Sequence, residues 1–200
     1  DLFSGAGGFS LAAIDLGINV FIAIEIDKYA CETYKHNLIN RMNNKIDLIN
    51  QDINEICIKS LMNKHNLSSG ELDIILGGPP CQGFSSHRIR NKGVGDPRNS
   101  LLIRYFDFVK QLRPKLFLVE NVPGLLWERH SDYLNTFKKL ALENGYKLNT
   151  PIKLNAKNYG VPQNRQRVFM LGVREDIKNS DMFWPPKSTH FSDHAPVYLN

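Results

Sequence analysis

The sequence is poor in cysteine and has no long apolar run. Its three cysteines, Cys31, Cys57 and Cys81, form neither a CxxC pair nor a disulfide pattern, which favours a reducing compartment. Without a cysteine pair we expect no metal site, although His190 and His194 have ligand spacing. No stretch approaches the ~18 apolar residues of a membrane span, and no charged-then-apolar leader opens the chain. We therefore expect a cytoplasmic protein without a membrane anchor.

The remaining composition is that of one globular domain. Hydrophobic residues make up 42% of the 200 residues, enough to cover both faces of a sheet. The net charge of +5 permits a polyanionic partner without requiring one. The chain begins at Asp1 without a methionine and stops in a stretch containing Pro, Ser and His, so we expect a fragment of a longer protein.

Short apolar runs alternate with helical patterns along the chain. The predicted strands are 20–24, 46–49, 72–76, 116–119 and 168–173, and the predicted helices are 29–38, 100–112, 131–144 and one that Asp52 opens as a capping residue. The runs are too apolar for a sheet with one solvated face. They predict an α/β fold with a doubly wound, mostly parallel sheet and helices on both faces. Ligands of such folds bind beyond the carboxyl ends of the strands.

The first such loop, DLFSGAGGFS at 1–10, places glycines between a strand and a helix. A dinucleotide pattern GxGxxG would need glycine at position 10, where Ser10 stands, so a pyrophosphate cofactor is not the best fit. Glu25 follows the second predicted strand, where a carboxylate can accept from both hydroxyls of a ribose. Asp52 follows the third and could cap a helix, receive an adenine amino group, or do both. S-adenosylmethionine would fit such a loop, and a plain glycine turn with a surface Glu is the alternative.

A second loop, GGPPCQGFSS at 77–86, follows the predicted strand at 72–76. Its two prolines fix φ and remove two backbone donors, so the chain cannot continue the sheet there. This layout is typical of a thiol that is presented rather than buried. Cys31 and Cys57 fall within helical patterns and are expected to be small core residues.

Seven motifs occur in a fixed order along the chain. They are DLFSGAGGFS, Glu25, Asp52, GGPPCQGFS, RNSL at 98–101, ENV at 120–122 and QNRQR at 163–167. In this order the sequence closely resembles the catalytic half of the DNA (cytosine-5) methyltransferases of the bacterial restriction–modification type. The resemblance implies a Rossmann-like class I methyltransferase fold. Residues 1–175 would be the S-adenosylmethionine-binding catalytic domain, and 176–200 a tail leading toward an absent target-recognition domain.

The resemblance also implies roles for single residues. The catalytic set is Cys81 as nucleophile, Glu120 as the acid facing the cytosine, and Arg165 and Arg167 as cations that hold the base and order the site, with Asn121 and Gln163 in support. The cofactor-binding set is Phe3, Gly5, Gly7, Gly8, Glu25, Ile26, Asp52, Ile53, Pro80 and Leu101. The DNA-binding set is Ser85, Arg88, Arg90, Lys92, Arg98 and Gln163, most of them in the basic segment 84–99, for which a solvated basic loop is the alternative.

The implied reaction moves a methyl group from S-adenosylmethionine to carbon 5 of a flipped-out cytosine in double-stranded DNA, leaving S-adenosylhomocysteine. A transfer-RNA cytosine-5 methyltransferase would use the same chemistry, although Gly83-Phe84-Ser85 favours the DNA enzyme. The third hypothesis is a cofactor-binding fragment with weak or no activity, because the recognition domain and the last two motifs are missing. We expect a monomer that associates with the nucleoid during action, with a cognate restriction endonuclease as a candidate partner.

Overall fold

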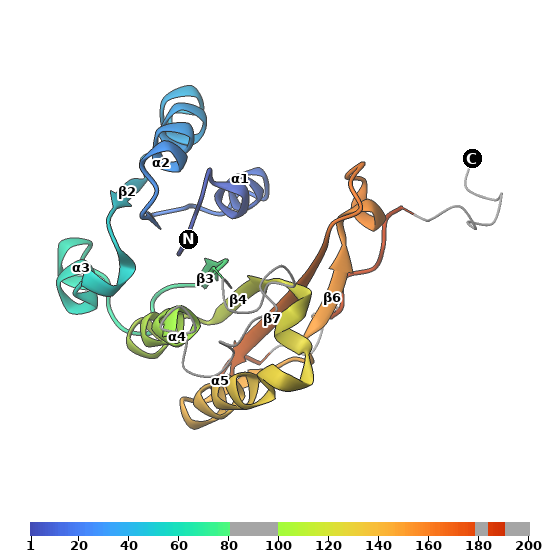
Figure 1. Cartoon of the computed structure of the whole chain (residues 1–200). Coiled ribbons are helices and arrows are strands. Elements are labelled where there is room, and N and C mark those ends of the chain that lie inside the picture. Colours follow the sequence, from blue (N-terminus) through green and yellow to red (C-terminus); the bar gives the residue numbers. More distant parts are fainter. Residues whose placement is uncertain (81–99, 179–183, 191–200) are drawn as a thin grey trace.

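The computed structural model describes residues 1–80, 100–178 and 184–190 and has a central sheet flanked by helices (Figure 1). The strands are β1 (Ile22–Glu25), β2 (Asp47–Asn50), β3 (Ile74–Gly77), β4 (Leu116–Asn121), β5 (Tyr146–Leu148), β6 (Ile152–Asn155) and β7 (Gln166–Arg174). The α-helices are α1 (Gly8–Asp15), α2 (Lys28–Tyr34), α3 (Ile58–Lys64), α4 (Ser100–Leu112) and α5 (Ser131–Glu143). The predicted fold class is confirmed. None of the described helices is long and apolar enough to cross a membrane.

The sheet has a parallel part and an antiparallel part. Strand β1 pairs in parallel with β2, β3 pairs in parallel with β4, and Leu2 forms parallel bridges to both Ile24 of β1 and Gly77 of β3. Strand β7 runs antiparallel to β4, and β5 and β6 pair one after the other with its opposite edge. The run at 168–173 is therefore a strand, as predicted, but an antiparallel one. Strands β5 and β6 were not predicted, because their three and four residues alternate apolar and polar side chains and so form no apolar run.

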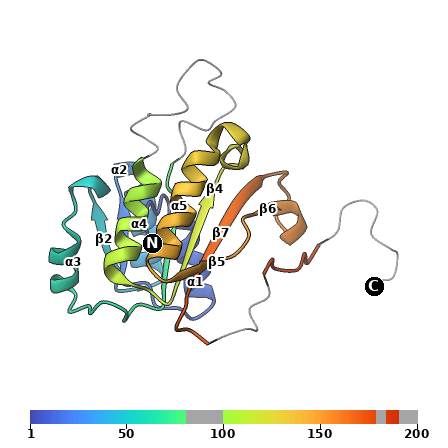
Figure 2. The same cartoon turned by 90° about the horizontal axis from the view of Figure 1, so that it is seen from below.

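Helices cover both faces of the sheet with separate apolar clusters. Ile24 belongs to the large cluster built with α3, α4 and α5, while its neighbour Ala23 packs with Tyr34 and Leu38 on the other face. Figure 2 shows α4 and α5 side by side over one face. Phe117 of β4 is fully buried at the centre of the large cluster. Its ring meets those of Tyr105, Phe106 and Phe137 edge-to-face at 6.3, 6.1 and 6.0 Å.

The helix predictions differ in outcome along the chain. Helix α4 has the predicted bounds, and α5 ends before Gly145, which has φ 76°. The predicted helix at 29–38 is α2 continued by a π-helix over Lys35–Arg41. The single helix predicted from Asp52 is wrong. Asp52 caps a 3₁₀ turn over Ile53–Glu55, the backbone is then extended through residues 56 and 57, and α3 begins only at Ile58.

Cys57 is exposed at the N-cap of α3, so its prediction as a core residue is wrong, whereas Cys31 is buried as predicted.

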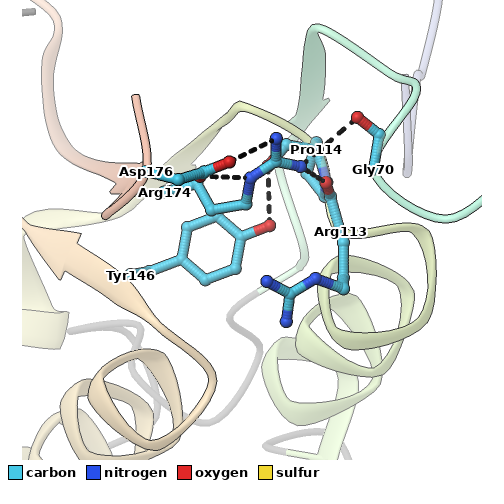
Figure 3. A network of polar contacts seen from close by, with 6 residues as sticks. All are labelled: Gly70, Arg113, Pro114, Tyr146, Arg174 and Asp176. Carbon is cyan, nitrogen blue, oxygen red and sulfur yellow. Dashed lines mark hydrogen bonds and ion pairs between the residues drawn. The ribbon is translucent and has the colours of Figure 1, made fainter. Parts of the chain in front are cut away.

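A polar network fixes the end of β7 (Figure 3). The Arg174 guanidinium pairs with both carboxylate oxygens of Asp176, at 2.6 and 3.1 Å. The Tyr146 hydroxyl donates a 2.7 Å hydrogen bond to a backbone carbonyl, and burial raises the pKa of Tyr146 to about 12. The carbonyls that accept in this network are those of Gly70 and Arg113 for Arg174 and that of Pro114 for Tyr146. The strand end is thereby tied to the end of α4 and to the loop before β3.

Candidate active site

A cavity of about 470 Å³ lies beyond the carboxyl ends of β1, β2 and β3. Its lining residues are Phe3, Ile24, Glu25, Ile26, Gln51, Asp52, Ile53, Asn54, Gly78, Pro80 and Leu101. The predicted cofactor residues Phe3, Glu25, Ile26, Asp52, Ile53, Pro80 and Leu101 thus meet around one space. The sequence reasoning missed Ile24, Gln51, Asn54 and Gly78, which lie within two positions of predicted residues in the chain.

The glycines of the first loop serve backbone geometry and packing. Gly5 has φ 54° and its N–H donates to the Glu25 carboxylate at 2.8 Å. Gly7 has φ 98°, and a Cβ there would lie 2.4 Å from Leu38 and 2.8 Å from Tyr34. Glycine is therefore required at position 7 by the close approach of the loop to the helix behind it. Gly5, Gly7 and Gly8 do not line the cavity.

The Glu25 carboxylate is oriented by the backbone on both sides. Oε2 accepts the Gly5 N–H, and Oε1 accepts the Asp27 N–H, each at 2.8 Å. Each carboxylate oxygen can accept a second hydrogen bond. Glu25 can therefore receive two hydroxyl donors from the cavity without giving up the bonds that hold it.

Asp52 combines a capping role with a free acceptor. Its Oδ1 accepts from the backbone N–H and the side-chain amide of Asn54, at 2.8 and 3.0 Å. The cap therefore uses only one oxygen, and Oδ2 can accept a donor such as an exocyclic amino group. The turn that follows is held by Arg104 of α4, which donates to the Ile53 carbonyl at 3.1 Å and to the Ile56 carbonyl at 2.6 Å.

Glu120 and Arg167 form an ion pair at the edge of the sheet. The Nε of Arg167 lies 2.7 Å from Oε1 of Glu120, and the two side chains are 25% and 24% exposed. They meet because β4 and β7 pair with Glu120 opposite Phe169, so position 167 lies diagonally across on the same face. Burial raises the pKa of the Glu120 carboxyl, and the charges of Arg167 and Arg165 oppose this shift without cancelling it.

Arg165 is exposed and affects Glu120 only through its charge, whereas Arg167 also bonds the carboxylate directly. Among the described residues Arg167 is the one that forms an ion pair with the Glu120 carboxylate.

The glycine–proline loop joins the cavity to this ion pair. Gly78 lines the cavity, and a Cβ built on it would lie 3.4 Å from Oε2 of Glu120. Asn121 is 2% exposed, and its amide donates to the Pro79 carbonyl at 3.2 Å while its oxygen accepts the Val122 N–H at 2.8 Å. Asn121 therefore anchors the loop that leads directly to residue 81.

Most of the remaining predicted site residues lie in the segment 81–99, which the structure does not describe. Cys81, Ser85, Arg88, Arg90, Lys92 and Arg98 lie outside the described residues. Gln163 is exposed in the turn before β7, where its carbonyl accepts the Arg165 N–H at 2.9 Å. Within 1–80, 100–178 and 184–190, no group of three or more His, Cys, Asp or Glu side chains could hold a metal ion.

The sheet covered by helices on both faces, with a cavity beyond the carboxyl ends of its parallel strands, is a Rossmann-like methyltransferase fold. A family model for C-5 cytosine-specific DNA methylases matches residues 1–197. The chain belongs to this family, and the sequence-based family assignment is confirmed.

Individual relatives agree with this assignment. The chain is 39% identical to the type II methyltransferase M.DdeI of Desulfomicrobium norvegicum, over 98% of this chain and 46% of that protein. It is 40% identical to M.FnuDI of Fusobacterium nucleatum, over 92% of this chain and 49% of the relative. The chain thus spans about half the length of these curated relatives.

Two solved structures are similar in fold and sequence. A proposed DNA modification methyltransferase from an E. coli prophage matches with a TM-score of 0.74 and 35% identity, over 88% of this chain and 46% of that one. A DNMT2 mutant from Spodoptera frugiperda matches with a TM-score of 0.67 and 26% identity, over 93% and 54%.

Proposed function

We propose that this chain is the catalytic half of a DNA (cytosine-5) methyltransferase that uses S-adenosylmethionine. The observation that carries the proposal is the Glu120–Arg167 pair, which lies beside the loop leading to Cys81 and next to the cavity. The names of the relatives, type II methyltransferases, support a restriction–modification setting with a cognate endonuclease.

The cavity fits a nucleoside carrying a sulfonium side chain. Phe3, Ile53 and Leu101 offer apolar surface for an adenine ring, and the open acceptors of Glu25 and Asp52 suit ribose hydroxyls and an exocyclic amine. When bound, S-adenosylmethionine supplies an electrophilic methyl group. The cavity reaches Gly78 and Pro80, so its far end adjoins the position of Cys81 in the chain.

Cys81 supplies the nucleophile that cytosine carbon 5 needs. This carbon is unreactive in the aromatic ring, but a thiolate that adds to carbon 6 makes carbon 5 enamine-like. Carbon 5 would then use that electron pair to bond the methyl carbon while the bond from that carbon to sulfur breaks, which leaves S-adenosylhomocysteine. Loss of the carbon 5 proton to solvent and departure of the thiolate from carbon 6 would restore the double bond, and the proton on ring nitrogen 3 would return to Glu120. The target base must be rotated out of the duplex, because carbon 6 is not accessible in the stack.

Glu120 and Arg167 handle the charge that addition creates. As the thiolate adds, negative charge develops on the ring, and a carboxylic acid at ring nitrogen 3 relieves it by donating a proton. The raised pKa of Glu120 favours the protonated form that this donation requires. Arg167 holds the carboxyl in place and can also donate to the base carbonyl. Arg88, Arg90, Lys92 and Arg98 would contact DNA phosphates.

Cofactor binding can be tested on residues 1–200 by isothermal titration calorimetry with S-adenosylhomocysteine. We expect Phe3→Ala and Glu25→Gln each to weaken binding by about tenfold or more. Glu32→Gln is the matched control, because Glu32 lies exposed on α2, where it pairs with Lys28 at 3.9 Å. Equal affinities for all four proteins would contradict the assigned cavity.

The nucleophile and the nucleic acid can be tested together with 5-fluorocytosine in the substrate. A fluorine at carbon 5 cannot leave as a proton does, so in the presence of S-adenosylmethionine a single methyl transfer, without repeated turnover, should leave an adduct on Cys81 that persists through denaturing electrophoresis. We expect the complex with duplex DNA and not with transfer RNA, and we expect it to disappear in Cys81→Ser. A complex formed only with transfer RNA would favour the alternative substrate.

Catalytic turnover by residues 1–200 alone should be weak or absent, because the chain spans about half the length of its relatives. Sequence-specific methylation of duplex DNA by this chain would contradict that expectation.

A further inference from the structure

Residues 184–190 follow the sheet in the chain but pack back onto β6 and the 3₁₀ turn that comes after it (Figure 1). The Trp184 indole N–H donates to the Thr150 carbonyl, just before β6, at 2.9 Å. At the other end of the segment, the His190 backbone N–H donates to the carbonyl of Asn158, in the 3₁₀ turn, at 2.9 Å. The segment is therefore attached near both ends of β6.

The far end of this segment packs on Gly160. This glycine has φ 87°, and a Cβ built on it would lie 2.8 Å from the His190 ring. The ring is oriented by Thr189, whose hydroxyl oxygen lies 3.0 Å from its Nδ1. The Tyr159 hydroxyl donates a further hydrogen bond to the Pro186 carbonyl at 3.0 Å. Glycine is therefore required at position 160 both by the backbone conformation and by the ring that rests on it.

The turn at 160–165 leads from this contact to the arginines of the site. It belongs to neither a helix nor a strand, and β7 begins directly after it. The Arg165 N–H donates to the Gln163 carbonyl, and the Arg165 carbonyl accepts the Ala156 N–H, each at 2.9 Å. These bonds shape the turn itself, while the contacts with 184–190 connect it to a separate part of the chain.

We propose that residues 184–190 are a clamp that keeps the Arg165 guanidinium within reach of Glu120, with His190 as the positioning residue. The proposal rests on the proposed function, in which Arg165 holds the target base. Arg165 is exposed and acts on Glu120 through its charge, an interaction that weakens as the two groups separate. A long side chain on a turn keeps a fixed position only if the backbone that carries it is fixed, and the clamp supplies this support.

The first test measures the pKa of the Glu120 carboxyl in residues 1–200 by carbon NMR titration. We expect His190→Ala to raise this pKa further, because the charge of Arg165 then opposes the effect of burial less. His190→Phe keeps a flat ring on Gly160 and should leave the pKa of Glu120 as it is in the unmodified chain. An unchanged pKa in His190→Ala would overturn the proposal.

A double-mutant cycle separates positioning from a general loosening of the sheet. Arg165→Gln alone should raise the pKa of Glu120, and adding His190→Ala should then raise it no further. His36→Ala is the matched control, because His36 is exposed on the π-helix that continues α2, and it should leave the pKa unchanged. An equal effect of His190→Ala with and without Arg165 would overturn the proposal.

Binding of S-adenosylhomocysteine shows whether the variant disturbs the whole fold. Its affinity should be the same in His190→Ala and in the unmodified chain, because no residue of 184–190 lines the cofactor cavity. A loss of that affinity would show a general disturbance and would overturn the assigned role.

The adduct with 5-fluorocytosine DNA connects the clamp to the reaction. We expect it to form about tenfold more slowly in His190→Ala, because a catalytic group displaced by about 1 Å can lose more than this in rate. An unchanged rate would overturn the proposal. No adduct in the unmodified chain would contradict the proposed function alone, since the titration of Glu120 needs neither cofactor nor DNA and would still decide whether the clamp acts.

Discussion

Gly172 of β7 should not tolerate even one added methyl group. It lies opposite Phe117 of β4, and an alanine Cβ there would come within 2.1 and 2.2 Å of two ring carbons. Ordinary contact begins near 3.4 Å, so the ring would have to move by more than an ångström. It cannot do so freely, because it is fully buried among four other rings. We therefore expect Gly172→Ala to lower the free energy of unfolding by about 3 kcal/mol, the upper end of the range for overpacked cores.

A double-mutant cycle separates this clash from a general weakness of the strand. Phe117→Leu alone should cost about 2 kcal/mol through lost burial and lost ring contacts. If the clash is with the ring, the smaller side chain leaves room for the added methyl, and the double variant should cost about 3 kcal/mol rather than the additive 5.

Urea unfolding followed by far-UV circular dichroism at 25 °C measures these free energies. Gly8→Ala is the control, because a Cβ there meets nothing within 4 Å. Strict additivity, or a Gly172→Ala variant within about 1 kcal/mol of the unmodified chain, would refute the reasoning. The site depends on the same pairing, since β4 and β7 bring Glu120 to Arg167 on the opposite face.

Three further outcomes follow from burial and charge. Iodoacetamide should alkylate Cys81 fastest, Cys57 second and the buried Cys31 last. Hydrogen bonds from Ser60 lower the pKa of Cys57, whereas burial raises the pKa of Cys31. Mass spectrometry of the alkylated peptides measures the order, and equal rates for the three cysteines would contradict it. Because burial raises the folded pKa of Glu120, its contribution to stability is present below the unfolded pKa and lost as pH rises through the folded pKa. Glu120→Gln should therefore gain stability relative to the unmodified chain between pH 4 and pH 7, measured by urea unfolding, and a relative loss over that range would count against it. Arg174→Met should lower Tm by several degrees, because two backbone carbonyls and a carboxylate lose their donor, and an unchanged Tm would show that the network contributes little.

Local patterns in the sequence predicted the elements that depend on local periodicity. Helix α4 has its predicted bounds because Leu102, Tyr105, Phe106 and Val109 recur on one face and are all buried there. The antiparallel direction of β7 could not be predicted, since an apolar run does not encode the direction of its neighbours. The prediction of a single helix from Asp52 failed because the cap was correctly placed but extended backbone at Ile56 ends the turn, and extended backbone at Cys57 precedes α3.

The ordered motifs predicted which residues line the cavity, but not the contacts that hold them in place. Phe3, Glu25 and Asp52 lie far apart in the chain, and the structure brings them to one cavity. Contacts that join distant backbone positions had no sequence signal. The amide of Asn121 on the Pro79 carbonyl is one example, and the packing that requires glycine at position 7 is another.

Helix α4 begins at Ser100, the residue that follows the segment 81–99, and within its first turns it supplies Leu101 to the cavity and Arg104 to the turn beneath it. A displacement of the first residue of this helix would therefore also move Leu101 in the wall of the cavity proposed for the cofactor. If duplex DNA binds the basic residues proposed for 84–99 and thereby displaces Ser100, binding of DNA and binding of the methyl donor are coupled. Thermodynamic reciprocity then requires that the methyl donor alter the affinity for DNA by the same factor as DNA alters the affinity for the donor.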